Sequence, residues 1–147
     1  MDKAVKFFQK SEQKMYEWLH TYFEQLDEEE DYELGLAYLR STLQVLRDRL
    51  GQNEAIQLGD QLPAMWRGLY YENWSPMQGP IKTRSGQAFL DAVEQKLTMK
   101  FPYIDHQQAT CAAMQTIFVK ISEGEMQQVI SNLHTRVRDI FEALPHR

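Results

Sequence analysis

Residues 39–70 read LRSTLQVLRDRLGQNEAIQLGDQLPAMWRGLY, and this stretch decides the fold. Leucines recur in its first part at spacings of three and four residues, which predicts a helix with one buried face. Gly51 follows the last of these leucines, and we interpret it as the left-handed residue that ends the helix. A short helix over about residues 53–60 is expected next. Pro63 then suits the start of another helix, because the first turn of a helix has N–H groups without partners.

The same pattern returns without a gap at residues 110–141, as TCAAMQTIFVKISEGEMQQVISNLHTRVRDIF. At this constant offset (110 − 39 = 71), apolar residues of the first half fall on apolar residues of the second, as Leu62 does on Leu133. Equal spacing implies equal helix and loop lengths. We therefore predict an all-α fold made by tandem duplication of a four-helix unit, with the two copies packed around a pseudo-twofold axis.

The repeat divides the chain, a single helical domain, into four parts. A helical arm covers about residues 1–13 and the first copy about residues 14–74. A cluster of prolines and glycine predicts a linker over residues 75–84, and the second copy covers about residues 85–145.

Helix starts are marked by side chains that can accept the first free backbone N–H groups, at Asp31, Ser85, Asp105 and Ser122. Residues 2–26 carry an apolar stripe of helical period, either as one long helix or as a short arm followed by a helix that begins at Ser11. The closing helix is expected to bury Leu144 and to end at Pro145.

The composition is that of an ordinary globular protein, with 43% hydrophobic and 25% charged residues. A net charge of −5 counts against nucleic acid as the main partner, since binding phosphates requires clustered Lys and Arg. Cys111 is the only cysteine, so an internal disulfide is impossible. The first residues do not resemble a secretory signal, and no apolar run is long enough to span a bilayer. We expect a soluble, cytoplasmic protein with no membrane partner.

Several of these segments together resemble a bacterial family called domain of unknown function 2267. The resemblance rests on Arg49-Leu50, Glu54 and Leu62-Pro63, on LYYENWSP at residues 69–76, and on KISEGE at residues 120–125 with Leu133. It covers about residues 14–144, and His134 departs from it where the family has a proline. The resemblance implies a helical tandem-repeat bacterial protein and supplies no activity.

Two groups of apolar residues are candidate interaction sites. Trp66, Tyr70, Tyr71 and Trp74 form the densest aromatic cluster, which either packs in the core or lines a groove for an apolar ligand or a partner helix. Phe118 and Val119 replace Arg47 and Asp48 of the first half, so that their helix is apolar on more than one face. This second pair packs between the halves or forms the seam of a homodimer.

Two polar pairs recur at the same offset: Glu54 with Glu125, and Arg67 with Arg138. One interpretation is structural, with the glutamates at helix starts and the arginines in surface ion pairs. The other is a pair of equivalent polar sites that face a partner.

Motifs of catalysis and cofactor binding are weak in this sequence. Glu17 and His20 have the spacing found in di-iron helical bundles, but the second half has Ala88 and Asp91 at the matching positions. Cys111 lies among alanines and is interpreted as a small core residue rather than a nucleophile. The sequence has no Gly-rich phosphate loop and no hydrolase or zinc motif, so we expect no enzyme, no metal and no cofactor.

The function predicted from these features is a non-catalytic protein-interaction or structural module, whose partner is another protein or a second copy of itself. Binding of a small apolar ligand in the aromatic cluster is the alternative. Nucleic-acid binding is a weaker one, through the short third and fourth helices with Arg136, Arg138 and Arg147.

Overall fold

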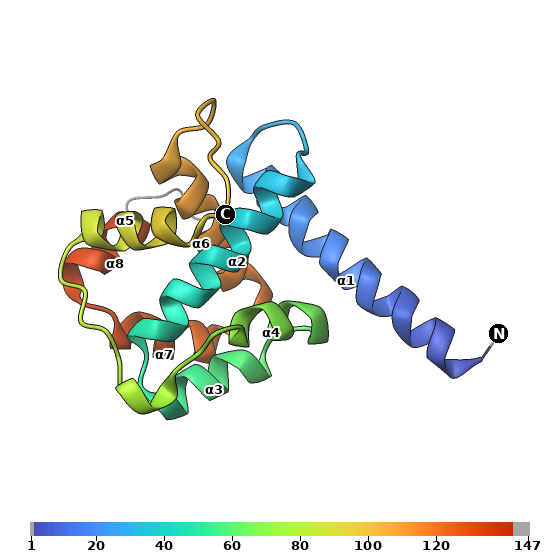
Figure 1. The fold of residues 1–147 in the computed structure, drawn as a ribbon, viewed down its shortest axis with the longest axis horizontal. Coiled ribbons are helices and arrows are strands. Elements are labelled where there is room, and N and C mark those ends of the chain that lie inside the picture. Colours follow the sequence, from blue (N-terminus) through green and yellow to red (C-terminus); the bar gives the residue numbers. More distant parts are fainter. Residues whose placement is uncertain (1, 143–147) are drawn as a thin grey trace.

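A computed structural model of the protein describes residues 2–142. Over this range the chain folds into eight α-helices and one 3-10 turn, with no β-strand, so the predicted all-α class is confirmed (Figure 1). The elements are α1 (Lys3–Leu26), α2 (Tyr32–Arg49), α3 (Gln52–Asp60), α4 (Ala64–Tyr71), η1 (Pro76–Gln78), α5 (Gly86–Lys96), α6 (His106–Lys120), α7 (Glu123–Asn132) and α8 (Thr135–Glu142). The expected burial of Leu144 and the stop at Pro145 lie outside the described residues.

The predicted capping residues stand at the start of their helices. Asp31, Ser85, Asp105 and Ser122 each accept a hydrogen bond from the backbone N–H three residues ahead, at 2.9–3.3 Å. Pro63 directly precedes α4, as expected. Four helix boundaries are therefore determined by side chains that satisfy otherwise free N–H groups.

One prediction about a helix end was wrong. Gly51 has φ −62°, so it is not left-handed; α2 ends at Leu50 in an extended conformation, and Gly51 precedes α3. The Glu54 carboxylate folds back over Gly51, 2.5 Å from where a Cβ atom would lie, and a side chain there would displace this flexible carboxylate. Of the two alternatives for residues 2–26, the structure shows the single long helix: α1 continues past Ser11 without a break to Leu26 and ends at Asp27, whose φ is 58°.

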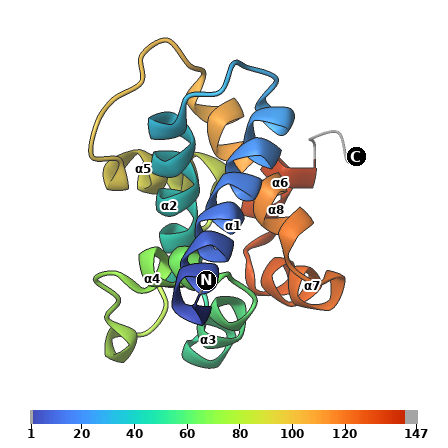
Figure 2. The same cartoon turned by 90° about the vertical axis from the view of Figure 1, so that its right-hand side faces the viewer.

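The body of the molecule is built around α2 and α6, which pack against each other. Helix α1 packs against α6, and α5 packs against α2, while α4 and α8 cover the remaining sides. Helices α3 and α7 meet at one end of the bundle (Figure 2). Each of the two central helices is thus covered on most of its faces, which explains why each buries residues all round.

Small residues occupy the middle of both central helices and are fully or almost fully buried: Ser41 and Thr42 in α2, and Ala109, Cys111, Ala112 and Ala113 in α6. Larger side chains pack around these small residues. Among them, Trp18 of α1 stacks on Trp66 of α4 with ring centroids 5.5 Å apart. Small side chains let the two helix axes approach while the aromatic residues fill the wider spaces.

Arg47 of α2 is 1% exposed and joins this helix to the end of α4 and, through Asp48, to α5. Its Nη1 donates to the carbonyl oxygens of Tyr70 and Glu72, at 2.6 and 2.7 Å, at the end of α4. Its Nε and Nη2 lie 3.0 and 2.9 Å from Oδ1 of Asp48, whose Oδ2 is 3.1 Å from Nζ of Lys96 on α5. The buried positive charge is therefore balanced by one carboxylate and two main-chain carbonyls.

Replacing this arginine removes one half of a buried ion pair. We expect Arg47→Met to lower the free energy of unfolding by about 3–5 kcal/mol, because the Asp48 carboxylate and two carbonyls lose their donor. Arg40→Met is the matched control in the same helix, because Arg40 and its partner Glu72 are both partly exposed. Its loss should stay within about 1 kcal/mol. Urea unfolding measures both, and equal losses would contradict the role given to Arg47.

Candidate functional site

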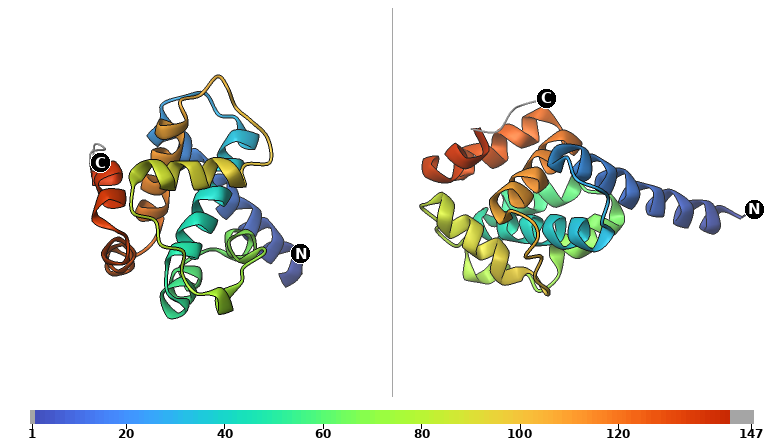
Figure 3. Two further views of the ribbon diagram at one scale, coloured as in Figure 1. Left: turned by 60° about the vertical axis from the view of Figure 1, so that its left-hand side comes forward. Right: turned by 90° about the horizontal axis from the view of Figure 1, so that it is seen from above.

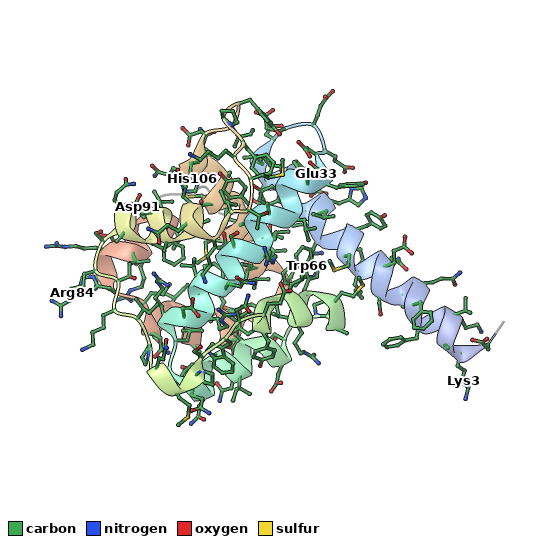
Figure 4. All side chains as sticks on the ribbon, in the orientation of Figure 1. Lys3, Glu33, Trp66, Arg84, Asp91 and His106 are labelled. Atoms are coloured by element: carbon green, nitrogen blue, oxygen red, sulfur yellow. The ribbon has the colours of Figure 1, made fainter. Side chains whose placement is uncertain are left out.

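The first half of α1 stands clear of the body, with Lys3 at its far tip (Figures 3 and 4). The buried residues of this helix begin only at Trp18. Phe7 and Phe8 are 59% and 64% exposed, which is unusual for two neighbouring aromatic residues. From here on, 'the arm' means residues 3–16, which extend slightly beyond the helical arm expected over about residues 1–13. Most of its side chains have no covering element within the described chain.

The arm has two chemically different faces. Lys3, Lys6, Lys10 and Lys14 are spaced by three and four residues, so they lie along one side. Ala4, Phe8, Ser11 and Met15 have the same spacing on another side, and their stripe continues directly into Trp18 and Tyr22 of the core. The apolar face that holds α1 on the body therefore continues along the arm: Met15 still packs against the core, whereas Ala4 and Phe8 are exposed.

The aromatic cluster singled out in the sequence is divided between core and surface. Trp66 and Tyr70 are fully buried, and the Tyr70 hydroxyl donates to the carbonyl oxygen of Ala55 at 2.7 Å. Tyr71 and Trp74 are partly exposed and pack on each other with ring centroids 5.4 Å apart. The four rings therefore do not line one open groove.

Phe118 and Val119 are half-buried in the wall of a cavity of about 260 Å³. Helices α6, α7 and α8 supply most of this wall, and Gln25 of α1 closes one side. The lining is mainly apolar and includes Met114, Met126, Ile130 and Leu133. The structure thus places the proposed seam residues beside a cavity between helices of the second half.

The residues that lie 71 positions before two of these lining residues have different surroundings. Arg47, which stands where the second half has Phe118, is buried there among carbonyl groups. Gly59 stands where the second half has Ile130, and a Cβ atom at Gly59 would clash with the Tyr71 hydroxyl. Counted back by 71 residues, the cavity-lining Phe118 and Ile130 thus fall on a buried arginine and on a glycine packed against Tyr71.

Arg67 and Arg138 occupy matching positions but make different bonds. Nε and Nη2 of Arg67 donate to the carbonyl oxygens of Gly59 and Leu62, at 2.9 and 2.8 Å. Arg67 thus joins the end of α3 to the start of α4 and has a structural role. Arg138 lines the cavity, and its Nη2 donates to Thr135 Oγ1 at 3.1 Å.

Glu54 and Glu125 lie at the first turns of α3 and α7, which pack together. Burial raises the pKa of Glu125, and the charges of Asp60 and Glu54 raise this pKa further. The Oε2 atom of Glu125 is buried and accepts no hydrogen bond in the described structure. This meeting point of the halves therefore holds a carboxyl group whose ionisation is unfavourable.

The remaining candidate residues have ordinary structural partners. His20 pairs through Nδ1 with Glu30 and not with Glu17. Cys111 is buried, and burial, followed by the charge of Asp105, raises the pKa of its thiol to about 11. A thiol of this kind is a poor nucleophile at neutral pH.

Metal clusters and membrane-spanning helices are both missing from the described chain. Within residues 2–142, no three His, Cys, Asp or Glu side chains are grouped in a way that would hold a metal ion. None of the helices in this range combines the length and the apolar character that crossing a bilayer requires.

Comparison with known families agrees with the motifs at the helix ends. Residues 15–140 match the family described as uncharacterized conserved protein, DUF2267. The chain belongs to this family. The resemblance found in the sequence is thereby confirmed. No curated protein matches the chain significantly. The DUF2267 match begins at residue 15, next to the body, so almost the whole arm precedes it.

The arm is the feature of this DUF2267 protein that sequence analysis missed as a site. The sequence predicted a helical arm over about residues 1–13, but its lysines and aromatic residues were not interpreted as a site. Only the packing of α1 against α6 shows that the body ends near Trp18.

The raised pKa of Glu125 predicts a pH-dependent gain from its removal. Above the usual titration range of a glutamate, the folded state must hold an unfavourable carboxylate that the unfolded chain ionises freely. Stability is therefore lost as the pH rises from the normal glutamate pKa through the raised one. Glu125→Gln should raise Tm at pH 7 and lose this advantage below about pH 4.

Glu123→Gln is the matched control, since Glu123 is exposed in the same first turn and both variants lose a charge near the helix dipole. Thermal unfolding followed by circular dichroism at both pH values measures the effect. A Tm difference between the two variants that does not change with pH would contradict the assignment.

Proposed function

We propose that the protein is a non-catalytic interaction module that joins a second copy of itself through the arm. The observation that carries this proposal is the uncovered apolar face of residues 3–16, which continues the stripe buried in the body. An amphipathic helix of this kind is a common means of docking into another protein.

Charge favours a second copy as the occupant. The arm and the preceding Asp2 contain four lysines and two acidic residues, out of 16 basic and 21 acidic residues in the chain. The rest of the chain therefore has 12 basic and 19 acidic residues (16 − 4 and 21 − 2). Exposed glutamates at positions 28–30 offer a complementary surface for the lysine face.

The body to which the arm is attached is, in this proposal, a tandem duplication of a four-helix unit. The offset between the ends of α2 and α6 equals that between the starts of α3 and α7 (120 − 49 = 123 − 52 = 71). Helix α8 at Thr135–Glu142 keeps the same offset from α4 at Ala64–Tyr71. The packing of α1 on α6 is mirrored by that of α5 on α2. Superposition of residues 15–71 on residues 86–142 by a half-turn in an experimental structure would test this.

A bacterial, cytoplasmic location is part of the same proposal and is supported by the buried, unpaired thiol of Cys111.

The self-association is tested by the oligomeric mass in solution. Wild-type protein should run in light scattering near twice the 17.4 kDa of one chain. Phe7→Ser combined with Phe8→Ser should return it to the monomer mass, because the apolar contact is lost while the helix propensity changes little.

Met77→Ser is the matched control, since Met77 is 92% exposed in η1 and away from the arm. Phe118→Glu tests the alternative that Phe118 and Val119 form the homodimer seam, and it should leave the oligomeric mass unchanged. A wild-type monomer at high protein concentration, or a dimer that survives the double substitution, would refute the proposal.

A second candidate function, binding of a small apolar ligand, is favoured by the cavity beside Phe118. In the aromatic cluster, Trp66 and Tyr70 are fully buried and present no surface to a ligand. The cavity, by contrast, combines an apolar wall with a volume of about 260 Å³. Clefts lined by apolar side chains and a few polar groups are typical of small-ligand sites.

Benzene is a suitable probe because an apolar cavity binds it without polar contacts. Adding benzene should shift the NMR methyl signals of Met114 and Met126 and leave that of Met77 unchanged. Met126→Trp should abolish the shift at Met114 by filling the space. Unmoved methyl signals in the wild type would exclude this function.

A further inference from the structure

Basic side chains of an acidic protein line one cleft between its two halves. The cleft measures about 660 Å³ and is lined by Arg49 at the end of α2, by Lys82 and Arg84 before α5, and by His134 before α8. No Asp or Glu is among its described lining residues. Figure 4 shows Arg84 at the outer edge of the molecule, where a ligand in solution can reach it.

Among residues 2–142, Asp91 lines a neighbouring pocket together with these three strong bases. In this part of the chain, none of Arg49, Lys82 and Arg84 forms an ion pair, although lysines and arginines elsewhere do. Arg49 is partly buried, and this burial lowers the pKa of its guanidinium, an effect that the Asp48 charge opposes. An anion in the cleft would relieve this unbalanced positive charge.

The loop that carries two of the bases is fixed to the body. The N–H of Ile81 donates to the carbonyl oxygen of Asp48 at 2.7 Å. Arg49 Nε donates to Thr83 Oγ1 at 2.8 Å. The loop is thus held at both sides of Lys82, and the cleft exists before a ligand binds.

Two helix starts add to the positive potential. Arg84 lies two residues before α5, and His134 directly precedes α8. The first turn of a helix presents free N–H groups and the positive end of the helix dipole, both of which favour anions. The two helix starts and the basic side chains therefore both favour an anion in this cleft.

We propose that this cleft binds a small phosphorylated molecule, with its phosphate groups on Arg49, Lys82 and Arg84 and its apolar part on Ile81. Arginine and lysine are the side chains that bind phosphate most strongly. Ile81 lines the cleft and is 52% exposed, so it offers an apolar surface beside the bases.

A small molecule fits better than a nucleic acid, although both present phosphate. Only a few bases gather here, whereas a nucleic-acid surface needs a longer stripe of them and an acidic protein repels a long polyanion. The site is independent of the arm, so its test does not depend on self-association.

The probes are ATP without metal ions, inorganic phosphate and a short DNA duplex, titrated into the full chain. ATP should shift the amide NMR signals of Ile81 and Thr83. Calorimetry should show ATP binding more tightly than inorganic phosphate, because several phosphate groups contact several bases.

Lys82→Gln combined with Arg84→Gln should weaken ATP binding by about tenfold or more, since two charge-assisted contacts are lost. Lys100→Gln combined with Lys120→Gln removes the same charge elsewhere and should change the affinity less than about twofold. Circular dichroism checks that each variant is folded. If the double variant does not fold, Arg84→Lys is measured in its place, and it should keep most of the ATP binding.

Three results would overturn the proposal. The first is the absence of shifts at Ile81 and Thr83 with ATP. The second is equal affinity of the two double variants. The third is tighter binding of the DNA duplex than of ATP with the same dependence on Lys82 and Arg84, which would assign the cleft to nucleic acid instead.

Discussion

The contact between α2 and α6 is the constraint on which the other helices depend. Both helices bury residues on nearly every side, so each needs neighbours all round. Thr42 and Ala113, small residues of the two helices, are both completely buried. Larger residues there would separate the axes and open the spaces that Trp18, Trp66 and Phe89 now fill. The positions of α1, α4, α5 and α8 follow from covering this central pair.

Two residues that lie 71 positions apart in the chain, Arg47 and Phe118, have very different surroundings. In the first half, Arg47 pairs with Asp48 and donates to carbonyl oxygens at the end of α4. In the second half, Phe118 stands at the matching place and a cavity remains beside it. The long polar residue thus joins two helices, whereas the aromatic one lines a cavity.

Charge is distributed as unevenly as packing. The chain is acidic overall, yet basic residues gather on the arm and around the cleft near Arg84, and carboxyl groups gather where α3 meets α7. Interactions between exposed charges are screened over about 10 Å in ordinary salt, so these regions act separately. The proposed self-association and the proposed phosphate site therefore rest on different residues.

The sequence by itself determined the helices, because their signals are local: apolar residues at spacings of three and four, and caps such as Asp31 and Ser122 that satisfy nearby N–H groups. The same stretch also carried the family motifs. The tertiary structure decided what each apolar face touches. It buried Trp66 and Tyr70, placed Phe118 beside a cavity, left the arm uncovered and gave Gly51 a role other than the predicted one. These outcomes depend on contacts between residues far apart in the chain, which no local spacing encodes.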